Sequence, residues 1–316
     1  MARARRRQRI GAAIDIGSYS VHLLVAAVKG NRLEEIHDES AFLGLGRAID
    51  AEGGFGPAGA QLVDTLGTFV ARAQAMGAVS ITVVGTDPLR RAVDATKVVA
   101  EIRATIGIDA VALSHEEEAL VALLGIRAGV PIERETVMVD VGGGSTEVLV
   151  VRPGETPVAV GLPLGATRLT GVHVQSDPPT RGALRALRAA SMNGFREAPP
   201  AAPAELLAVG GTARSLLRVG PRLSNRVLTA RRIERALDVI GANPALGVAS
   251  QYAVRLSRAH VLAAGAAILL AAMNRYRLDR LRVARGGLRE GLILAEAHGG
   301  ARWREMVPRL AMGWPD

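Results

Sequence analysis

The sequence predicts an α/β protein made of two copies of one folding unit, and three observations lead to this prediction. Apolar, strand-like runs alternate with segments of helical spacing along the chain. The length of 316 residues suits two domains of about 150 residues each. Two unrelated motifs also recur at one offset of 125 residues, from 15 to 140 and from 84 to 209. A repeat this long indicates a duplicated domain, and duplicated units usually face each other across a ligand-binding cleft.

The secondary-structure elements follow from the apolar runs and the residues that interrupt them. Strands are expected over 12–16, 21–28, 80–84, 110–113 and 206–209, with a turn at 29–32 leading into a further strand. Helices are expected over 61–75, 88–106, 116–128 and 213–218. Gly129 and Pro131, followed by a polar stretch, end one helix and mark the predicted domain boundary.

Composition and charge exclude several classes of protein. The absence of cysteine excludes disulfide scaffolds, Cys-ligated zinc, iron–sulfur clusters and thiol nucleophiles. The longest apolar stretch, Val261–Met273, is too short to span a bilayer, so no membrane partner is expected. No targeting segment is apparent, which favours a cytoplasmic location.

The formal net charge of +9 is concentrated at the N-terminus. Five arginines within the first nine residues form a basic arm, interpreted as a solvated tail: Arg3, Arg5, Arg6, Arg7 and Arg9. The aromatic residues, two Trp, three Tyr and four Phe, are scattered and give no platform for stacking bases. A nucleic-acid polymer is therefore not an expected partner, whereas a smaller polyanion is.

The first repeated motif places a turn with glycine directly after a strand. The two copies read Asp15-Ile16-Gly17-Ser18-Tyr19-Ser20 and Asp140-Val141-Gly142-Gly143-Gly144-Ser145. Glycine permits φ > 0 and lets a ligand approach bare N–H groups, while the serine hydroxyls add donors. Phosphate oxygens need many donors, so both turns are predicted to bind phosphate.

An aspartate opens each of these turns, and its charge does not by itself favour phosphate. Such a carboxylate makes sense as a metal ligand between anions, because Mg²⁺ sites use one or two carboxylates plus substrate oxygens. Asp15, Asp140 and Glu147 are the predicted metal ligands.

Two further segments are candidates for phosphate binding. Val209-Gly210-Gly211-Thr212 ends a strand and opens a helix, and a helix N-terminus attracts anions. Arg90 and Arg91 lie in the first turn of a predicted helix and point about 100° apart, so at most one faces a site. Arg90 is the candidate, since a guanidinium matches phosphate bidentately. No GxGxxG pattern follows a strand, which excludes the nicotinamide-binding alternative.

One glutamate in the run Ser114-His115-Glu116-Glu117-Glu118 has no structural explanation. Ser114 and Glu117 form a capping box, and Glu116 suits the first turn of the helix. Glu118 is not needed by the cap. It is either a solvated helix residue or a general base that acts on water in the cleft. His115 and His260 are expected to be surface or core histidines rather than ligands.

Five segments together resemble the exopolyphosphatase / guanosine-pentaphosphate phosphohydrolase (Ppx/GppA) phosphatase family in its short, two-domain form. They are residues 13–22, 139–147, Leu113-Ser114-His115-Glu116-Glu117-Glu118-Ala119, Ala208-Val209-Gly210-Gly211-Thr212-Ala213 and Gly287-Leu288-Arg289-Glu290-Gly291. Three positions depart from the family pattern: Tyr19 replaces a common Asn, His115 a frequent Gly, and Asp94 a usual Asn.

The resemblance implies duplicated actin/hexokinase-like (ribonuclease H-like) domains with an interdomain cleft. The expected limits are 1–130 for a first actin-like ATPase-type domain, completed by a C-terminal helix at about 296–316, and 131–295 for a second. The resemblance also implies Mg²⁺ or another divalent cation, and Glu118 as the catalytic base.

The function expected from the resemblance is release of terminal orthophosphate from inorganic polyphosphate, or hydrolysis of guanosine pentaphosphate. Either molecule is the expected partner, and a homodimer is the candidate assembly. Two alternatives stay open: a non-catalytic sensor of polyphosphate or alarmone, and a phosphotransferase or ATPase of the same fold.

Overall fold

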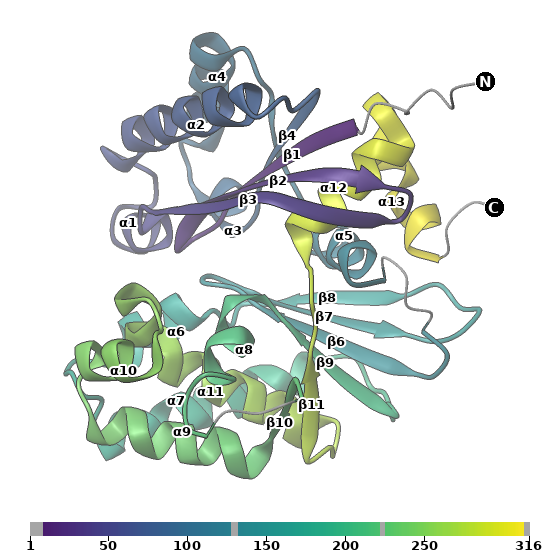
Figure 1. Ribbon diagram of the computed structural model, residues 1–316. Helices are drawn as coiled ribbons and strands as arrows, with labels where there is room; N and C mark the ends of the chain where they lie inside the picture. The colour runs from purple at the N-terminus through teal and green to yellow at the C-terminus, as the bar shows by residue number, and fades with distance from the viewer. Residues whose placement is uncertain (1–8, 128–131, 222–224, 313–316) are drawn as a thin grey trace.

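Two mixed sheets, one above the other, organise the computed structural model, which describes residues 9–127, 132–221 and 225–312 (Figure 1). The first sheet has the strand order β3-β2-β1-β4-β5, with β1 Arg9–Ile16, β2 Ser20–Lys29, β3 Arg32–Phe42, β4 Ser80–Gly85 and β5 Ala110–Ala112. The second has the order β10-β11-β9-β6-β7-β8, with β6 Thr136–Val141, β7 Thr146–Val151, β8 Val158–Leu162, β9 Glu205–Val209, β10 Val227–Thr229 and β11 Arg280–Val283.

The first sheet is accompanied by helices from both ends of the chain. They are α1 Leu45–Glu52, α2 Ala58–Ala75, α3 Asp87–Arg91, α4 Ala95–Ile106, α5 His115–Arg127, α12 Leu288–Gly299 and α13 Trp303–Met312. Helices between β8 and β11 belong to the second sheet. They are α6 Ala166–His173, α7 Arg181–Gly194, α8 Gly210–Leu216, α9 Ala230–Ala242, α10 Ala245–Tyr252 and α11 Leu256–Arg275. Short 3₁₀ turns occupy Phe195–Glu197 and Gly300–Arg302.

The strand register confirms the duplication. Asp15 on β1 pairs with His22 on β2 and with Val84 on β4. Asp140 on β6 pairs with Glu147 on β7 and Val209 on β9, so every partner lies 125 residues further along. Each half contains an antiparallel three-stranded meander extended by parallel strands. This is the predicted α/β fold, a duplicated actin/hexokinase-like architecture.

The single helix expected over 88–106 is wrong, because the structure has two helices there, α3 and α4. Ala92 adopts an extended conformation between them. This break brings the Asp94 carboxylate within 2.9 Å of the Phe55 backbone N–H, which donates to it, and the Phe55 side chain is fully buried. A tertiary contact has therefore overridden the local helical pattern.

The apolar stretch at 261–273 belongs to a longer helix, α11, of 20 residues. By length and composition this helix resembles a membrane span, but 72% of its apolar window is buried inside the protein. It packs against the helices of the second half and against β6. Its apolar character is thus explained by its place in the second core.

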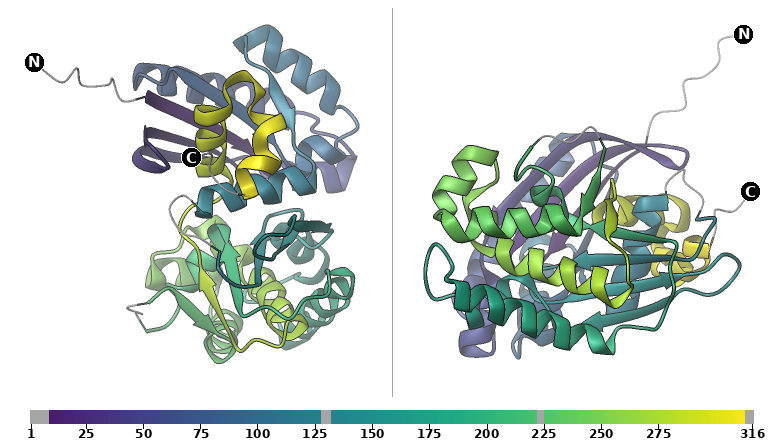
Figure 2. Two further views of the ribbon diagram at one scale, coloured as in Figure 1. Left: turned by 90° about the vertical axis from the view of Figure 1, so that its right-hand side faces the viewer. Right: turned by 90° about the horizontal axis from the view of Figure 1, so that it is seen from below.

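Helices α5, α12 and α13 pack together beside the first sheet, where the C-terminal helices are yellow in Figure 2. Helix α12 also contacts β1 and β2, so the end of the chain returns to the first half. The predicted domain limits remain a prediction, and the boundary at Gly129 and Pro131 lies outside the described residues, as do residues 1–8 of the basic arm.

Helices α5 and α12 cross so closely that Gly291→Ala should destabilise the protein by about 1–3 kcal/mol. A Cβ at this position would lie only 1.8 Å from the Val121 carbonyl oxygen on α5. Gly67→Ala in α2 is the control, because a Cβ there meets nothing within 4 Å, and it should be neutral or stabilising. Urea denaturation of both variants measures this difference, and equal midpoints would show that the crossing tolerates a methyl group.

Candidate active site

The two repeated turns meet across the cleft between the sheets. A Cβ built on Gly143 would lie 3.2 Å from the Tyr19 backbone nitrogen, so the β6–β7 turn touches the β1–β2 turn. A Cβ on Gly144 would lie 1.9 Å from Oδ2 of Asp87. Only glycine therefore fits at position 144 while the β6–β7 turn lies against Asp87.

The prediction that φ > 0 explains the glycines of these two turns is wrong. We expected them to supply φ > 0, but Gly17, Gly142, Gly143 and Gly144 all lie outside the left-handed region, and among the predicted site glycines Gly210 alone adopts it. The turns are instead closed by ordinary hydrogen bonds, in which the N–H groups of Gly17 and Gly142 donate to the carbonyls of Ser20 and Ser145. Close approach, rather than backbone strain, accounts for glycine here.

A cavity of about 140 Å³ lies where the two turns meet, and most of the predicted site residues line it. They are Asp15, Gly17, Ser18, Tyr19, Ser20, Glu118, Asp140, Gly142, Gly143, Gly144, Ser145, Gly210 and Gly211. Three others do not line it. Arg90 and Glu147 belong to the adjoining polar network, whereas the buried side chain of Thr212 packs against Gly265 of α11.

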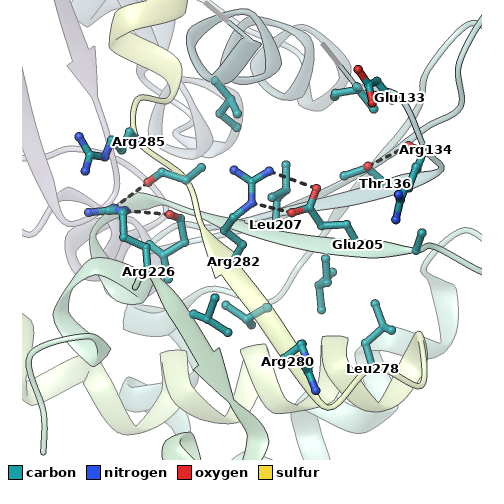
Figure 3. A pocket seen from close by; sticks show the side chains of 18 of the residues that line it. Glu133, Arg134, Thr136, Glu205, Leu207, Arg226, Leu278, Arg280, Arg282 and Arg285 are labelled. Carbon is teal, nitrogen blue, oxygen red and sulfur yellow. Dashed lines mark hydrogen bonds and ion pairs between the residues drawn. The ribbon is translucent and has the colours of Figure 1, made fainter. Parts of the chain in front are cut away.

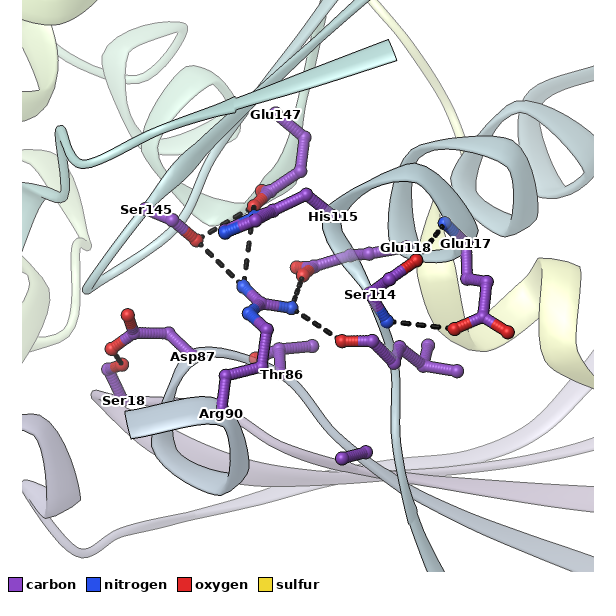
Figure 4. A network of polar contacts seen from close by, with 12 residues as sticks. Ser18, Thr86, Asp87, Arg90, Ser114, His115, Glu117, Glu118, Ser145 and Glu147 are labelled. Atoms are coloured by element: carbon purple, nitrogen blue, oxygen red, sulfur yellow. Dashed lines mark hydrogen bonds and ion pairs between the residues drawn. The ribbon is translucent and has the colours of Figure 1, made fainter. Parts of the chain in front are cut away.

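Arg90 is the centre of the polar network beside this cavity (Figure 4). Its guanidinium donates to Oε2 of Glu118 at 2.8 Å, to the Leu113 carbonyl at 2.9 Å and to Oγ of Ser145 at 3.2 Å. It also lies 3.6 Å from Oε1 of Glu147. Arg90 thus connects α3 and α5 of the first half to β7 of the second. Its neighbour Arg91 points elsewhere and donates to Asp87 and Asp50.

The capping box at the start of α5 is confirmed and separates the roles of two adjacent glutamates. The Ser114 N–H donates to Glu117 at 2.8 Å, and the Glu117 N–H donates to the Ser114 hydroxyl at 3.1 Å. Glu117 also pairs with Arg304 of α13. Glu118 takes no part in the cap, and its side chain is buried against Arg90 in the cleft. The interpretation of Glu118 as a solvated helix residue is therefore wrong.

Several carboxyl groups share this space, and their charges oppose one another. Burial, with the neighbouring charge of Glu147, raises the pKa of Glu118 well above its usual value despite Arg90. Burial, Glu147 and Asp15 together raise the pKa of Asp140 to about 7. Burial likewise raises the pKa of Asp15 to about 6, with Arg289 opposing and Glu147 adding to the shift. Burial and the neighbouring carboxylates thus make Glu118, Asp140 and Asp15 harder to ionise.

These residues fit a hard divalent cation. Oδ1 of Asp15 and Oε2 of Glu147 are buried oxygens without a hydrogen-bond partner. Buried acceptors are normally satisfied, so unpaired oxygens within a carboxylate cluster suggest a missing positive partner. Mg²⁺ takes oxygen ligands of this kind and usually keeps substrate oxygens and water as well.

The structure adds cavity residues that the sequence did not single out. Arg214 and Arg258 line the cavity from the second half, and the Arg258 guanidinium lies 5.1 Å from the centre of the Tyr19 ring. Asp87 accepts a hydrogen bond of 2.6 Å from Ser18. His22 lines the cavity too, and burial together with Arg289 lowers its pKa to about 3, so it is neutral. No local motif marks Arg214 or Arg258.

A larger cavity of about 740 Å³ lies elsewhere, near the starts of β6 and β9 (Figure 3). It is lined by several arginines, but Arg282 is paired with Glu205, and Arg226 donates to the carbonyls of Val283 and Ala284. None of the glycine turns reaches it. The smaller cavity therefore remains the candidate active site.

Comparison with known proteins identifies the class to which this fold and site belong. The model of the Ppx/GppA phosphatase family matches residues 24–299, and the chain belongs to this family. It is accordingly a phosphoric anhydride hydrolase. Exopolyphosphatase 1 of Mycobacterium tuberculosis is 31% identical over 302 residues, covering 89% of this chain and 86% of the relative.

A second curated relative and two solved structures extend the comparison. Guanosine-5'-triphosphate,3'-diphosphate pyrophosphatase of Vibrio atlanticus is 25% identical over 89% of this chain and 58% of the relative. The Aquifex aeolicus family member superposes with a TM-score of 0.77 at 26% identity, covering 92% of this chain and 97% of the other. An exopolyphosphatase of Cytophaga hutchinsonii has a TM-score of 0.79 at 20% identity, with 90% and 96% covered, and shares the fold.

Asp140→Asn should stabilise the cation-free protein at pH 7.5 by about 1 kcal/mol or more. A carboxyl whose pKa is raised by folding, here from 3.8 to about 7, favours the folded state only when it is protonated. The contribution of Asp140 to the free energy of unfolding therefore falls as pH rises from about 4 to about 7. The Asp140→Asn variant has no titrating group at this position and keeps its stability over this range. Urea midpoints with a chelator measure the gain, which should vanish near pH 4. Equal midpoints at pH 7.5 would contradict it.

Proposed function

We propose that this protein releases terminal orthophosphate from inorganic polyphosphate by Mg²⁺-assisted hydrolysis, with Glu118 as general base. The observation that carries the proposal is the meeting of both glycine turns, Glu118 and the carboxylate pair Asp15 and Asp140 at one cavity. The names of the relatives, an exopolyphosphatase and a guanosine-pentaphosphate pyrophosphatase, support the substrate class.

The two turns would bind the terminal phosphate between them. Residues 17–20 and 142–145 line the cavity, and the backbone N–H groups of residues 18–19 and 143–144 would donate to phosphate, since those of Gly17 and Gly142 close the turns. The hydroxyls of Ser18 and Ser145, which here donate to Asp87 and Glu147, would turn toward the phosphate when it binds. Gly210 and Gly211 add the N-terminus of α8. Donors fixed by the fold need no reorganisation when charge develops on the phosphate oxygens. A cavity of about 140 Å³ suits a chain end rather than an entire nucleotide.

A divalent cation would be held by the oxygens of Asp15, Asp140 and Glu147. When bound, Mg²⁺ supplies positive charge that offsets the phosphate oxygens and the crowded carboxylates. Asp15 and Asp140 open the two turns, so the cation ligands and phosphate donors are parts of the same hairpins.

Glu118 would accept the proton from water. It is buried at the cavity wall, and Arg90 fixes one of its oxygens at 2.8 Å. A raised pKa makes the ionised carboxylate a stronger base, since proton transfer improves as the pKa of the base approaches the working pH. Arg90 holds that carboxylate in position and offsets its charge.

A phosphate-release assay tests the proposal against its alternatives. The substrates are polyphosphates of several lengths, guanosine pentaphosphate and ATP, each with and without Mg²⁺. We expect Mg²⁺-dependent release from polyphosphate, with guanosine pentaphosphate as the second candidate substrate. Turnover of ATP alone would indicate the phosphotransferase or ATPase alternative. Binding of polyphosphate without release would indicate a sensor.

Glu118→Gln should lower turnover at least hundredfold and leave substrate binding nearly unchanged, because the amide keeps the size of the side chain but cannot accept the proton. The adjacent variant Glu117→Gln is the matched control. It weakens the capping box and the Arg304 pair, so it should lower stability while turnover stays within a few-fold of the wild type. Steady-state kinetics and thermal unfolding distinguish the two effects. Full turnover in Glu118→Gln would eliminate its role as base.

A further inference from the structure

The start of α5 and the facing strand β7 carry a group of potential metal ligands that includes a histidine. His115 and Glu118 lie three residues apart on this helix, and Glu147 faces them from β7 of the other half. One potential ligand atom from each of the three residues lies within 4.8 Å of the others. Nδ1 of His115 is 2.9 Å from Oε1 of Glu147. The group therefore combines an imidazole with two carboxylates across the cleft.

Two observations show that this group is more than a surface acidic cluster. Glu147 is 1% exposed, yet its Oε2 has no hydrogen-bond partner. The His115 ring is held in place against β8, since a Cβ on Gly161 would lie 2.0 Å from it. The imidazole is thus fixed beside a buried carboxylate oxygen that lacks a partner.

We propose that His115, Glu118 and Glu147 bind a divalent transition metal of the zinc class, and that this binding inhibits the enzyme. Zinc accepts imidazole nitrogen and carboxylate oxygen in tetrahedral sites with three protein ligands and one water, whereas Mg²⁺ takes oxygen ligands. The ligand atoms around zinc lie about 3.3 Å apart, so the observed spread requires shifts of about 1 Å.

The inhibition follows from the shared carboxylate, and this part of the inference rests on the proposed function. A metal bound to Glu118 takes the lone pair that the proposed base uses on water. It would also tie α5 to β7 and hold the two halves together. Arg90 competes for the same carboxylate through its 2.8 Å hydrogen bond. Oε2 of Glu147 has no hydrogen-bond partner, so the zinc site would share Glu147 with the proposed Mg²⁺ site.

Isothermal titration calorimetry with ZnCl₂, on the whole chain without a histidine tag and without substrate, tests the site. We expect one zinc per chain, with an affinity reduced at least tenfold in His115→Gln and in Glu147→Gln. His260→Gln is the matched control, because this exposed histidine of α11 lies outside the cluster. Cobalt in place of zinc should give visible absorption typical of a tetrahedral site, and His115→Gln should lose it. Unchanged affinity in both cluster variants, or no binding to the wild type, overturns the proposal.

Inhibition is measured separately, as the zinc concentration that halves Mg²⁺-dependent phosphate release relative to each variant's own uninhibited rate. This concentration should rise at least tenfold in His115→Gln and stay unchanged in His260→Gln. Equal sensitivity of wild type and His115→Gln contradicts the inhibitory role. A chain that releases no phosphate from any substrate fails the proposed function, while the titration still decides the metal site.

Discussion

The arrangement of the site depends on one guanidinium placed between two buried glutamates. Arg90 hydrogen-bonds Glu118 of the first half and lies 3.6 Å from Glu147 of the second, so a single cation offsets both carboxylates. Without it, two buried negative charges would face each other across the cleft, an arrangement whose cost is large in a low-dielectric environment. Arg90 therefore supports the closed contact between the halves and also keeps the proposed base in position.

Duplication has produced a site whose two halves are equivalent in backbone but different in chemistry. The register of β1 with β2 repeats in β6 with β7, yet the residue opposite the aspartate is neutral His22 in one copy and buried Glu147 in the other. In the proposed function both hairpins would bind phosphate, whereas only the second half carries a second carboxylate, Glu147, opposite its aspartate. In the proposed mechanism the cation and the base would then act from different sides of one anion.

Local patterns predicted much of the fold and the site. The turns after Asp15 and Asp140, the capping box that left Glu118 unexplained and the strand runs are all written in adjacent residues, and the structure shows each of them. Features that depend on distant residues were not predictable. The break between α3 and α4 follows from a contact with Phe55, and Arg258 reaches the cavity from the N-terminus of a long apolar helix. Gly143 and Gly144 serve close packing between the halves, which no single segment reveals.

The central claim is that both hairpins bind one phosphate group between them. A crystal structure with Mg²⁺ and a non-hydrolysable polyphosphate analogue tests it most directly. The account predicts that the terminal phosphate accepts hydrogen bonds from residues 17–20 and from residues 142–145, with Glu118 beside it. A terminal phosphate bound by one hairpin alone, or seated in the larger cavity near the starts of β6 and β9, would contradict the account.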